Sequence, residues 1–198
     1  MLYNQHNLNV AKFAAKGGGR PELNGVYFTA DKTVATDAIR LLEISTPANL
    51  PVADFPQVGG VSAMRGAKPF ILLGSMLRER VKLSNKKNSM PYERVMAIKH
   101  VHENRVEVLT TDGLRSFNTN IARLSGKFPD YEAIFPAGAA KAEVVINGKL
   151  LAEMLEELAE LDSLGNVKIK FYAKDKPVVL EAGDLNQNGR GMIMPIKE

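Results

Sequence analysis

Apolar residues recur along the chain in one order, a short helical spacing followed by two or three strand-like runs. In the first copy, Val10 and Phe13 fall on one face of a helix. We predict that this helix begins after an N-cap at Asn7 and ends at Gly17. Strands are expected to follow over residues 25–30, 33–36 and 39–44.

The second copy repeats this order after one added strand. Leu73, Leu77 and Val81 recur four residues apart, which predicts an amphipathic helix from Gly74 to about Ser84. Asp112–Gly113 is a strong hairpin signal, because this dipeptide suits the tight turn between two antiparallel strands. Strands are expected over residues 69–73, 94–102, 105–111 and 114–118.

The third copy begins near Glu143, with Asn147 as the N-cap of a helix that runs to Leu161. Its strands are expected over residues 144–146, 167–173, 178–182 and 192–196. Residues 46–66 are rich in Pro and Gly and are interpreted as a connection, with an edge strand at 52–55 left open. Three such repeats predict an α+β fold, in which each helix packs its apolar face on a sheet.

Composition excludes several classes of protein. The 198 residues include no Cys, which excludes disulfides, thiolate metal sites and a Cys nucleophile. No apolar run is long enough to span a membrane, and the first residues lack the pattern of a secretory signal, so we expect a cytoplasmic protein.

Few residues suggest catalysis. His100 and His102 share one face of a predicted strand, but no third metal ligand is evident. Asp37 and Asp112 occupy predicted turns, and Gly17–Arg20 follows a helix instead of preceding one as a phosphate loop would. We therefore expect no enzyme activity, no catalytic residues, no cofactor and no metal site.

Charge is unevenly placed around a net value of +4. The stretch from Lys68 to Arg105 carries nine basic and three acidic side chains, whereas Lys149–Asp162 carries one basic and five acidic. A basic surface favours nucleic acid, although a charge run is as often a solvated face.

Three segments resemble one family. They are Thr33–Leu42 (TVATDAIRLL), Gly126–Pro136 (GKFPDYEAIFP) and Met192–Ile196 (MIMPI). Together they resemble the bacterial DNA polymerase III beta subunit, the sliding clamp, whose middle domain carries the first two motifs and whose last strand carries the third. Ala38 and Ile39 stand where the family has glycine and histidine.

The resemblance implies a DNA-clamp fold of three half-domain repeats per chain in a shortened form. Residues 1–136 resemble the middle clamp domain, with repeats at 1–45 and 68–136. Residues 137–198 resemble the second half of the last domain. Because rings of this family contain twelve repeats, three per chain imply a homo-oligomer, with four chains closing one ring.

The resemblance also implies a processivity factor that encircles duplex DNA, contacts phosphates without reading bases, and tethers a DNA polymerase. The expected DNA-binding residues are Lys12, Lys16, Arg20, Arg78, Lys82, Lys86 and Lys87. Polymerase or clamp-loader peptides would occupy an apolar pocket between the middle and last domains. Its expected residues are Thr36, Asp37, Arg40, Leu41, Pro136, Met192, Ile193, Met194, Pro195 and Ile196.

Two other functions stay open at this stage. The chain could be a clamp-derived interaction module that binds replication partners without encircling DNA, or a small α+β DNA-binding protein with no clamp role. The acidic third helix would repel phosphate, so it is expected to face away from DNA or to meet a basic partner.

Overall fold

The computed structural model divides the chain into two compact units. We call Met1–Tyr131 the N-terminal unit and Glu132–Glu198 the C-terminal unit. The structure describes residues 2–47, 68–84, 86, 88–136, 138–140, 142–184 and 187–196. The edge strand considered at 52–55 and the candidate DNA contact Lys87 lie outside these residues.

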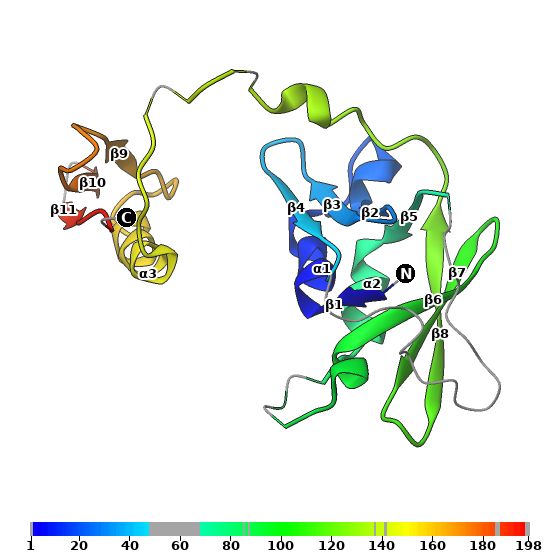
Figure 1. The fold of residues 1–198 in the computed structure, drawn as a ribbon. Coiled ribbons are helices and arrows are strands. Elements are labelled where there is room, and N and C mark those ends of the chain that lie inside the picture. The colour runs from blue at the N-terminus through cyan, green and yellow to red at the C-terminus, as the bar shows by residue number, and fades with distance from the viewer. Residues whose placement is uncertain are drawn as a thin grey trace. The chain divides into compact units, whose positions relative to one another are not determined.

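The N-terminal unit contains two copies of the strand–helix–strands repeat (Figure 1). The first copy consists of β1 (Leu2–Asn4), α1 (Gln5–Asn9), β2 (Gly25–Phe28), β3 (Lys32–Thr36) and β4 (Leu41–Ser45). The second consists of β5 (Phe70–Leu73), α2 (Gly74–Arg80), β6 (Val95–Val101), β7 (Arg105–Thr111) and β8 (Ser116–Leu124). Short 3-10 turns cover Val10–Phe13, Pro21–Asn24 and Pro91–Arg94.

The two repeats exchange their first strands. All eight strands form one antiparallel sheet in the order β1-β6-β7-β8-β5-β2-β3-β4. The first strand of repeat one, β1, pairs with β6 of repeat two, and the first strand of repeat two, β5, pairs with β2 of repeat one. The predicted α+β fold with antiparallel sheets is therefore confirmed.

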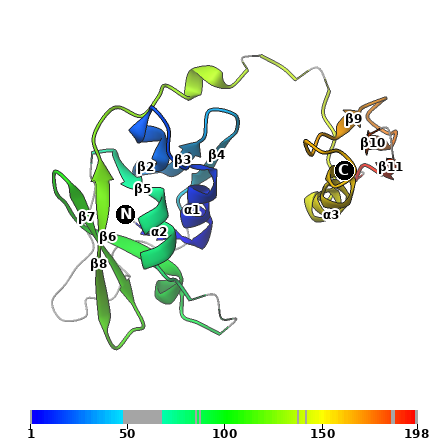
Figure 2. The same cartoon turned by 180° about the vertical axis from the view of Figure 1, so that it is seen from behind.

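Both helices of the N-terminal unit lie side by side on one face of the sheet (Figures 1 and 2). Their apolar sides meet the sheet in the main core, where Leu77, Val26 and Met96 are fully buried. The opposite face is covered by Phe128 and Tyr131, which pack on Tyr27 and its neighbours. Residues 126–131 thus cover part of the second face of the sheet, over β2, β3 and β5.

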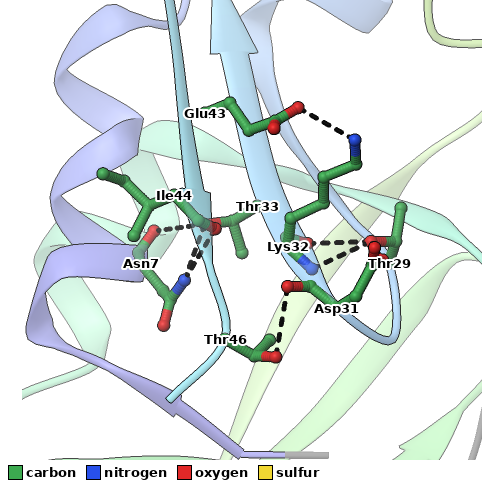
Figure 3. A network of polar contacts seen from close by, with 8 residues as sticks. All are labelled: Asn7, Thr29, Asp31, Lys32, Thr33, Glu43, Ile44 and Thr46. Carbon is green, nitrogen blue, oxygen red and sulfur yellow. Dashed lines mark hydrogen bonds and ion pairs between the residues drawn. The ribbon is translucent and has the colours of Figure 1, made fainter. Parts of the chain in front are cut away.

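Asn7 does not cap the first helix, which corrects the sequence prediction. The helix begins earlier, because the Asn4 side chain accepts hydrogen bonds from the backbone N–H groups of His6 and Asn7. The Asn7 amide is fully buried and donates to Thr33 Oγ1 at 3.1 Å and to the Ile44 carbonyl at 3.1 Å (Figure 3). Asn7 therefore ties α1 to the pair of strands β3 and β4.

The C-terminal unit holds the third repeat, α3 (Gly148–Ala159) and a three-stranded sheet in the order β11-β10-β9. Its strands are β9 (Lys168–Lys170), β10 (Val178–Gly183) and β11 (Asn188–Ile193). Asn147 caps α3 as predicted, with its side chain accepting from Lys149 N and Leu150 N. The core of this unit lies between α3 and the sheet.

Three of the four strands predicted in the C-terminal unit differ from the structure by more than one residue, and one of them, β9, spans only Lys168–Lys170 of the predicted 167–173. The segment 144–146 is not a regular strand, although the Val145 carbonyl accepts a hydrogen bond from Ile196 N at 2.7 Å. β11 begins at Asn188, earlier than the start predicted at residue 192, and ends at Ile193. Gly189 and Gly191 lie directly under α3, where a Cβ atom would overlap Leu161 or Met154.

Candidate functional site

A groove of about 260 Å³ between α1 and α2 gathers three of the predicted DNA-binding residues. Lys12, Arg78 and Lys82 line it together with the polar side chains of Gln5 and Asn9. The groove forms because α1 and α2, one from each repeat, pack against each other on the sheet. It offers cations beside neutral hydrogen-bonding groups, which is the chemistry that binds phosphate without reading bases.

Backbone carbonyls hold two of these cations in place. Arg78 Nη1 of repeat two donates to the Ala11 carbonyl of repeat one at 2.9 Å. Lys82 Nζ donates to the Arg78 carbonyl at 2.9 Å, where α2 ends. In the part of the chain that the structure describes, no carboxylate forms an ion pair with Lys12, Arg78 or Lys82. The positive charge of the groove is therefore not neutralised by those residues.

The other described candidates lie outside this groove. Lys16 and Arg20 are exposed in the loop after the first 3-10 turn, where Gly17 and Gly18 have positive φ angles. Lys86 is exposed beyond α2, and its carbonyl accepts from Arg94. Gln5 and Asn9 were not predicted as site residues, although their four-residue spacing places them on one helix face and could have indicated them. In the structure, their side chains form a 3.0 Å hydrogen bond.

The Thr36–Leu41 segment forms a turn organised by its own side chains. Asp37 Oδ1 accepts from the N–H groups of Ile39 and Arg40 at 3.1 and 3.0 Å, and Arg40 Nε donates to Asp37 Oδ2 at 3.0 Å. Hydrogen bonds from Arg40 and Ile39 lower the pKa of the Asp37 carboxyl to about 2. The carboxylate thus has a structural role in the turn, and Leu41 is half-buried against the outer apolar cluster.

The same turn occurs a second time in the N-terminal unit. Thr111 Oγ1 donates to the Arg115 carbonyl at 2.8 Å as Thr36 Oγ1 donates to the Arg40 carbonyl, and Asp112 repeats the role of Asp37. The sequences are TDAIR and TDGLR. This correspondence was readable from the sequence and was missed.

The chain end presents exposed apolar side chains in the C-terminal unit. Met192, Met194 and Ile196 are 64%, 57% and 52% exposed, respectively. A cavity of about 550 Å³ is lined by Val144, Val145, Met194, Pro195 and Ile196, with Lys174 and Asp175 at its polar side. Ile193 instead packs in the core of the unit and offers little surface to a ligand.

The residues predicted to form a peptide site lie in both units. Thr36, Asp37, Arg40 and Leu41 belong to the N-terminal unit, whereas exposed Pro136 and the Met192–Ile196 segment belong to the C-terminal unit. Val145 and Lys174 line the cavity with the Met194–Ile196 segment but were not predicted as site residues. Val145 lies beside this segment because its carbonyl accepts a hydrogen bond from Ile196 N, a contact that sequence spacing does not reveal.

Within the described ranges, no group of three or more His, Asp or Glu side chains is placed to hold a metal ion. His102 instead contacts Glu107 at 2.9 Å. None of the helices in these ranges has both the length and the apolar character needed to cross a bilayer.

Comparison with solved structures identifies the fold as that of DNA sliding clamps. The sliding clamp of Pseudomonas aeruginosa matches 98% of this chain with a TM-score of 0.70 and 19% identity. The DNA polymerase III beta chain of Streptococcus pneumoniae matches 100% of it with a TM-score of 0.64 and 18% identity. The beta subunit of Streptococcus pyogenes gives a TM-score of 0.68 at 14% identity.

The chain therefore has the fold of the DNA polymerase III beta subunit, and it spans about half the length of the solved clamps that it matches. A second P. aeruginosa clamp structure, 18% identical, holds griselimycin. No protein-family model and no curated protein sequence matches the chain.

Proposed function

We propose that the protein is a sliding-clamp-like processivity factor that contacts duplex DNA without sequence preference and tethers a DNA polymerase. The observation that carries this proposal is the basic groove, where Lys12, Arg78 and Lys82 lie together on a fold shared with sliding clamps. Such contacts are electrostatic, so binding weakens steeply with salt. We infer that Lys16, Arg20, Lys86 and Lys87 add to the same field.

The DNA contact can be tested by measuring duplex binding as salt is varied. Each phosphate contact contributes about 0.9 to the slope of log K against log salt, so Lys82→Ala should lower the slope by about 1. Lys176→Ala, which removes one exposed lysine from the C-terminal unit, is the matched control and should leave the slope unchanged. An equal loss in both variants would contradict a dedicated groove.

Encirclement has a separate signature. A closed ring stays on circular duplex and slides off linear duplex with free ends, whereas a surface contact treats both alike. Retention on circular DNA alone is the expected result, in a ring that we propose to contain four chains. Equal retention on linear DNA would favour the small DNA-binding protein, and a sedimentation profile of monomer alone would contradict the ring.

We also propose that Met192, Met194 and Ile196 bind partner peptides. Exposed methionines suit such a surface because their side chains are flexible and adapt to different apolar ligands. Griselimycin, which a P. aeruginosa clamp binds, is a suitable probe. Met194→Ser should weaken its binding by calorimetry, and Leu164→Ser, at an exposed position outside the cavity lining, should not.

Arg40→Ala tests whether the Thr36–Leu41 turn contributes to the same affinity. An effect of Met194→Ser alone would restrict the ligand surface to the C-terminal unit. Griselimycin binding without any DNA binding would favour the second function, a clamp-derived interaction module that recognises replication partners. That alternative rests on the same apolar surface and needs no ring.

A further inference from the structure

The C-terminal unit contains one repeat, and the N-terminal unit shows what such a repeat packs against. In the N-terminal unit, repeat two is completed by repeat one in two places. β1 covers the open edge of β6, and β2 covers the open edge of β5. In the C-terminal unit, the corresponding edges are the outer side of β9 and the outer side of residues 143–146.

Strand registers establish the correspondence residue by residue. Val178 faces Ile193 as Val106 faces Ile121, and Leu180 faces Ile169 as Val108 faces Ile98. The bond from Ile196 to Val145 lies where Leu124 pairs with Ile71. The N-caps of the two helices, Asn147 and Leu73, also correspond. The third repeat thus follows the plan of the second, and the described residues of the C-terminal unit hold no further repeat to complete it.

On the core side of the sheet, the third repeat is less buried than the second at the positions that would face such a complement. Leu180 and its counterpart Val108 are both fully buried, because they face their own helix. Ile169 is 42% exposed, whereas its counterpart Ile98 in the N-terminal unit is 0% exposed. Leu151 and Leu155 of α3 are half-buried, and their counterparts are buried beside α1, namely Leu77 of α2 and Val81 just after that helix.

We propose that the C-terminal unit pairs with the C-terminal unit of a second copy of this chain, so that two third repeats build one complete clamp domain. The pairing within the N-terminal unit is reciprocal, each first strand lying on the other repeat, and this is the arrangement that a two-fold axis between identical copies produces. Residues 143–146 of each copy then lie antiparallel to β9 of the other. The inference deepens the self-association included in the proposed function and does not depend on DNA or peptide binding.

The register of this pairing follows from the N-terminal unit. Leu2 faces Ala97 and Tyr27 faces Ile71, which places Val145 opposite Lys168 of the other copy. Continuing by two residues places the carboxylate of Glu143 opposite the ammonium of Lys170, which also forms an ion pair with Glu181 of its own copy at 2.6 Å. These opposite charges share the solvent face of the sheet, while Val144 and Ile146 face the core side with Ile169.

The two α3 helices would bring like charges toward each other. By sequence position, Glu156 of α3 corresponds to Lys82, which follows the end of α2 and lines the groove between the helices of the N-terminal unit. Screening by salt therefore strengthens the dimer, because the apolar contacts gain and the carboxylate repulsion falls. This is the reverse of the salt dependence expected for DNA binding.

Cross-linking tests the register directly, because the chain has no native Cys. Val145 uses its carbonyl to pair with Ile196, so Val145 and Lys168 of the other copy form a non-hydrogen-bonded pair with Cα atoms about 4.5 Å apart, within disulfide reach. Within one copy, these residues are separated by three strand spacings, at least about 14 Å. In the full chain, Val145→Cys with Lys168→Cys should give a covalent dimer under oxidation.

Each Cys variant alone, and Val145→Cys combined with Leu164→Cys in the turn after α3, should give no covalent dimer. A non-covalent assay complements this test. Light scattering of the wild type should report a species of at least twice 21.7 kDa that tightens as salt is raised, two such pairs making up the proposed four-chain ring, and Ile169→Glu should halve its mass. Leu164→Glu, at an exposed position in the turn after α3, is the control that should keep the dimer.

An oligomer that keeps its mass in Ile169→Glu, with no cross-link in the double Cys variant, would overturn this pairing and leave self-association through another surface intact. A wild-type chain that is monomeric at all salt concentrations would overturn both. Covalent ladders longer than a dimer would also overturn the inference, because reciprocal pairing closes after two copies.

Discussion

Ala38 occupies a backbone conformation that suits glycine, and replacing it is expected to stabilise the protein. Ala38 has a φ of 75° and is the single non-glycine residue with positive φ in the described ranges. The matching position in the second turn, Gly113, has a φ of 87°. A left-handed conformation costs a residue with a Cβ about 1–2 kcal/mol in the folded state. Glycine removes this cost, but its greater freedom stabilises the unfolded chain by about 0.4–1 kcal/mol, which must be subtracted from the gain.

Because the Ala38 side chain is exposed, Ala38→Gly removes no packing, and the balance should favour folding by about 0.5–1 kcal/mol. For a unit of this size, that corresponds to a rise in Tm of about 2–4 °C, measurable by calorimetry. Ala30→Gly is the matched control, since Ala30 is exposed in a turn without positive φ, and it should lower Tm. A fall in Tm for both variants would refute the reasoning.

Two other changes test the polar contacts of the N-terminal unit. Asn7→Ala should lower the free energy of unfolding by about 2–3 kcal/mol in urea titration, because Thr33 and the Ile44 carbonyl then lose a buried hydrogen-bond donor. Asn9→Ala is the control and should lower it far less. Equal losses in the two variants would contradict the role of Asn7. The hydrogen bond from His102 lowers the pKa of Glu107 from 4.5 to about 2, so the carboxylate stabilises the fold above about pH 4.5 and loses this effect as pH falls through about 2. The Tm difference between wild type and Glu107→Gln should therefore shrink toward pH 2, and a difference that does not change with pH would contradict the assignment.

Strands with clear alternation were predictable from the sequence. β7 was predicted with its observed bounds, because apolar residues alternate along it and Asp112–Gly113 marks the turn after it. β8 extends to Leu124, beyond the predicted end at Asn118, because pairing with β7 holds a polar stretch in the sheet. The start of β11 was missed for a related reason, since its glycines admit α3 at close range and do not mark a loop.

The candidate site was predictable in part. Four-residue spacing predicts that Arg78 and Lys82 lie close together, and they do although α2 ends at Arg80. The meeting of Lys12 with them depends on how α1 packs against α2. Ile193 resembles its exposed neighbours in sequence, yet the register with Val178 turns it into the core. Contacts between residues distant in the sequence decide both cases, and periodicity alone carries no information about them.

The exchange of first strands has a consequence for how the protein folds during synthesis. Leu2 pairs with Ala97, so β1 finds its partner strand only after residue 97 has been synthesised. Closing so long a loop is slow, and the first repeat meanwhile exposes apolar surface that repeat two covers in the native state. Folding of the N-terminal unit is therefore expected to be all-or-none and late, and a nascent chain stalled before Val95 should depend on chaperones to stay in solution.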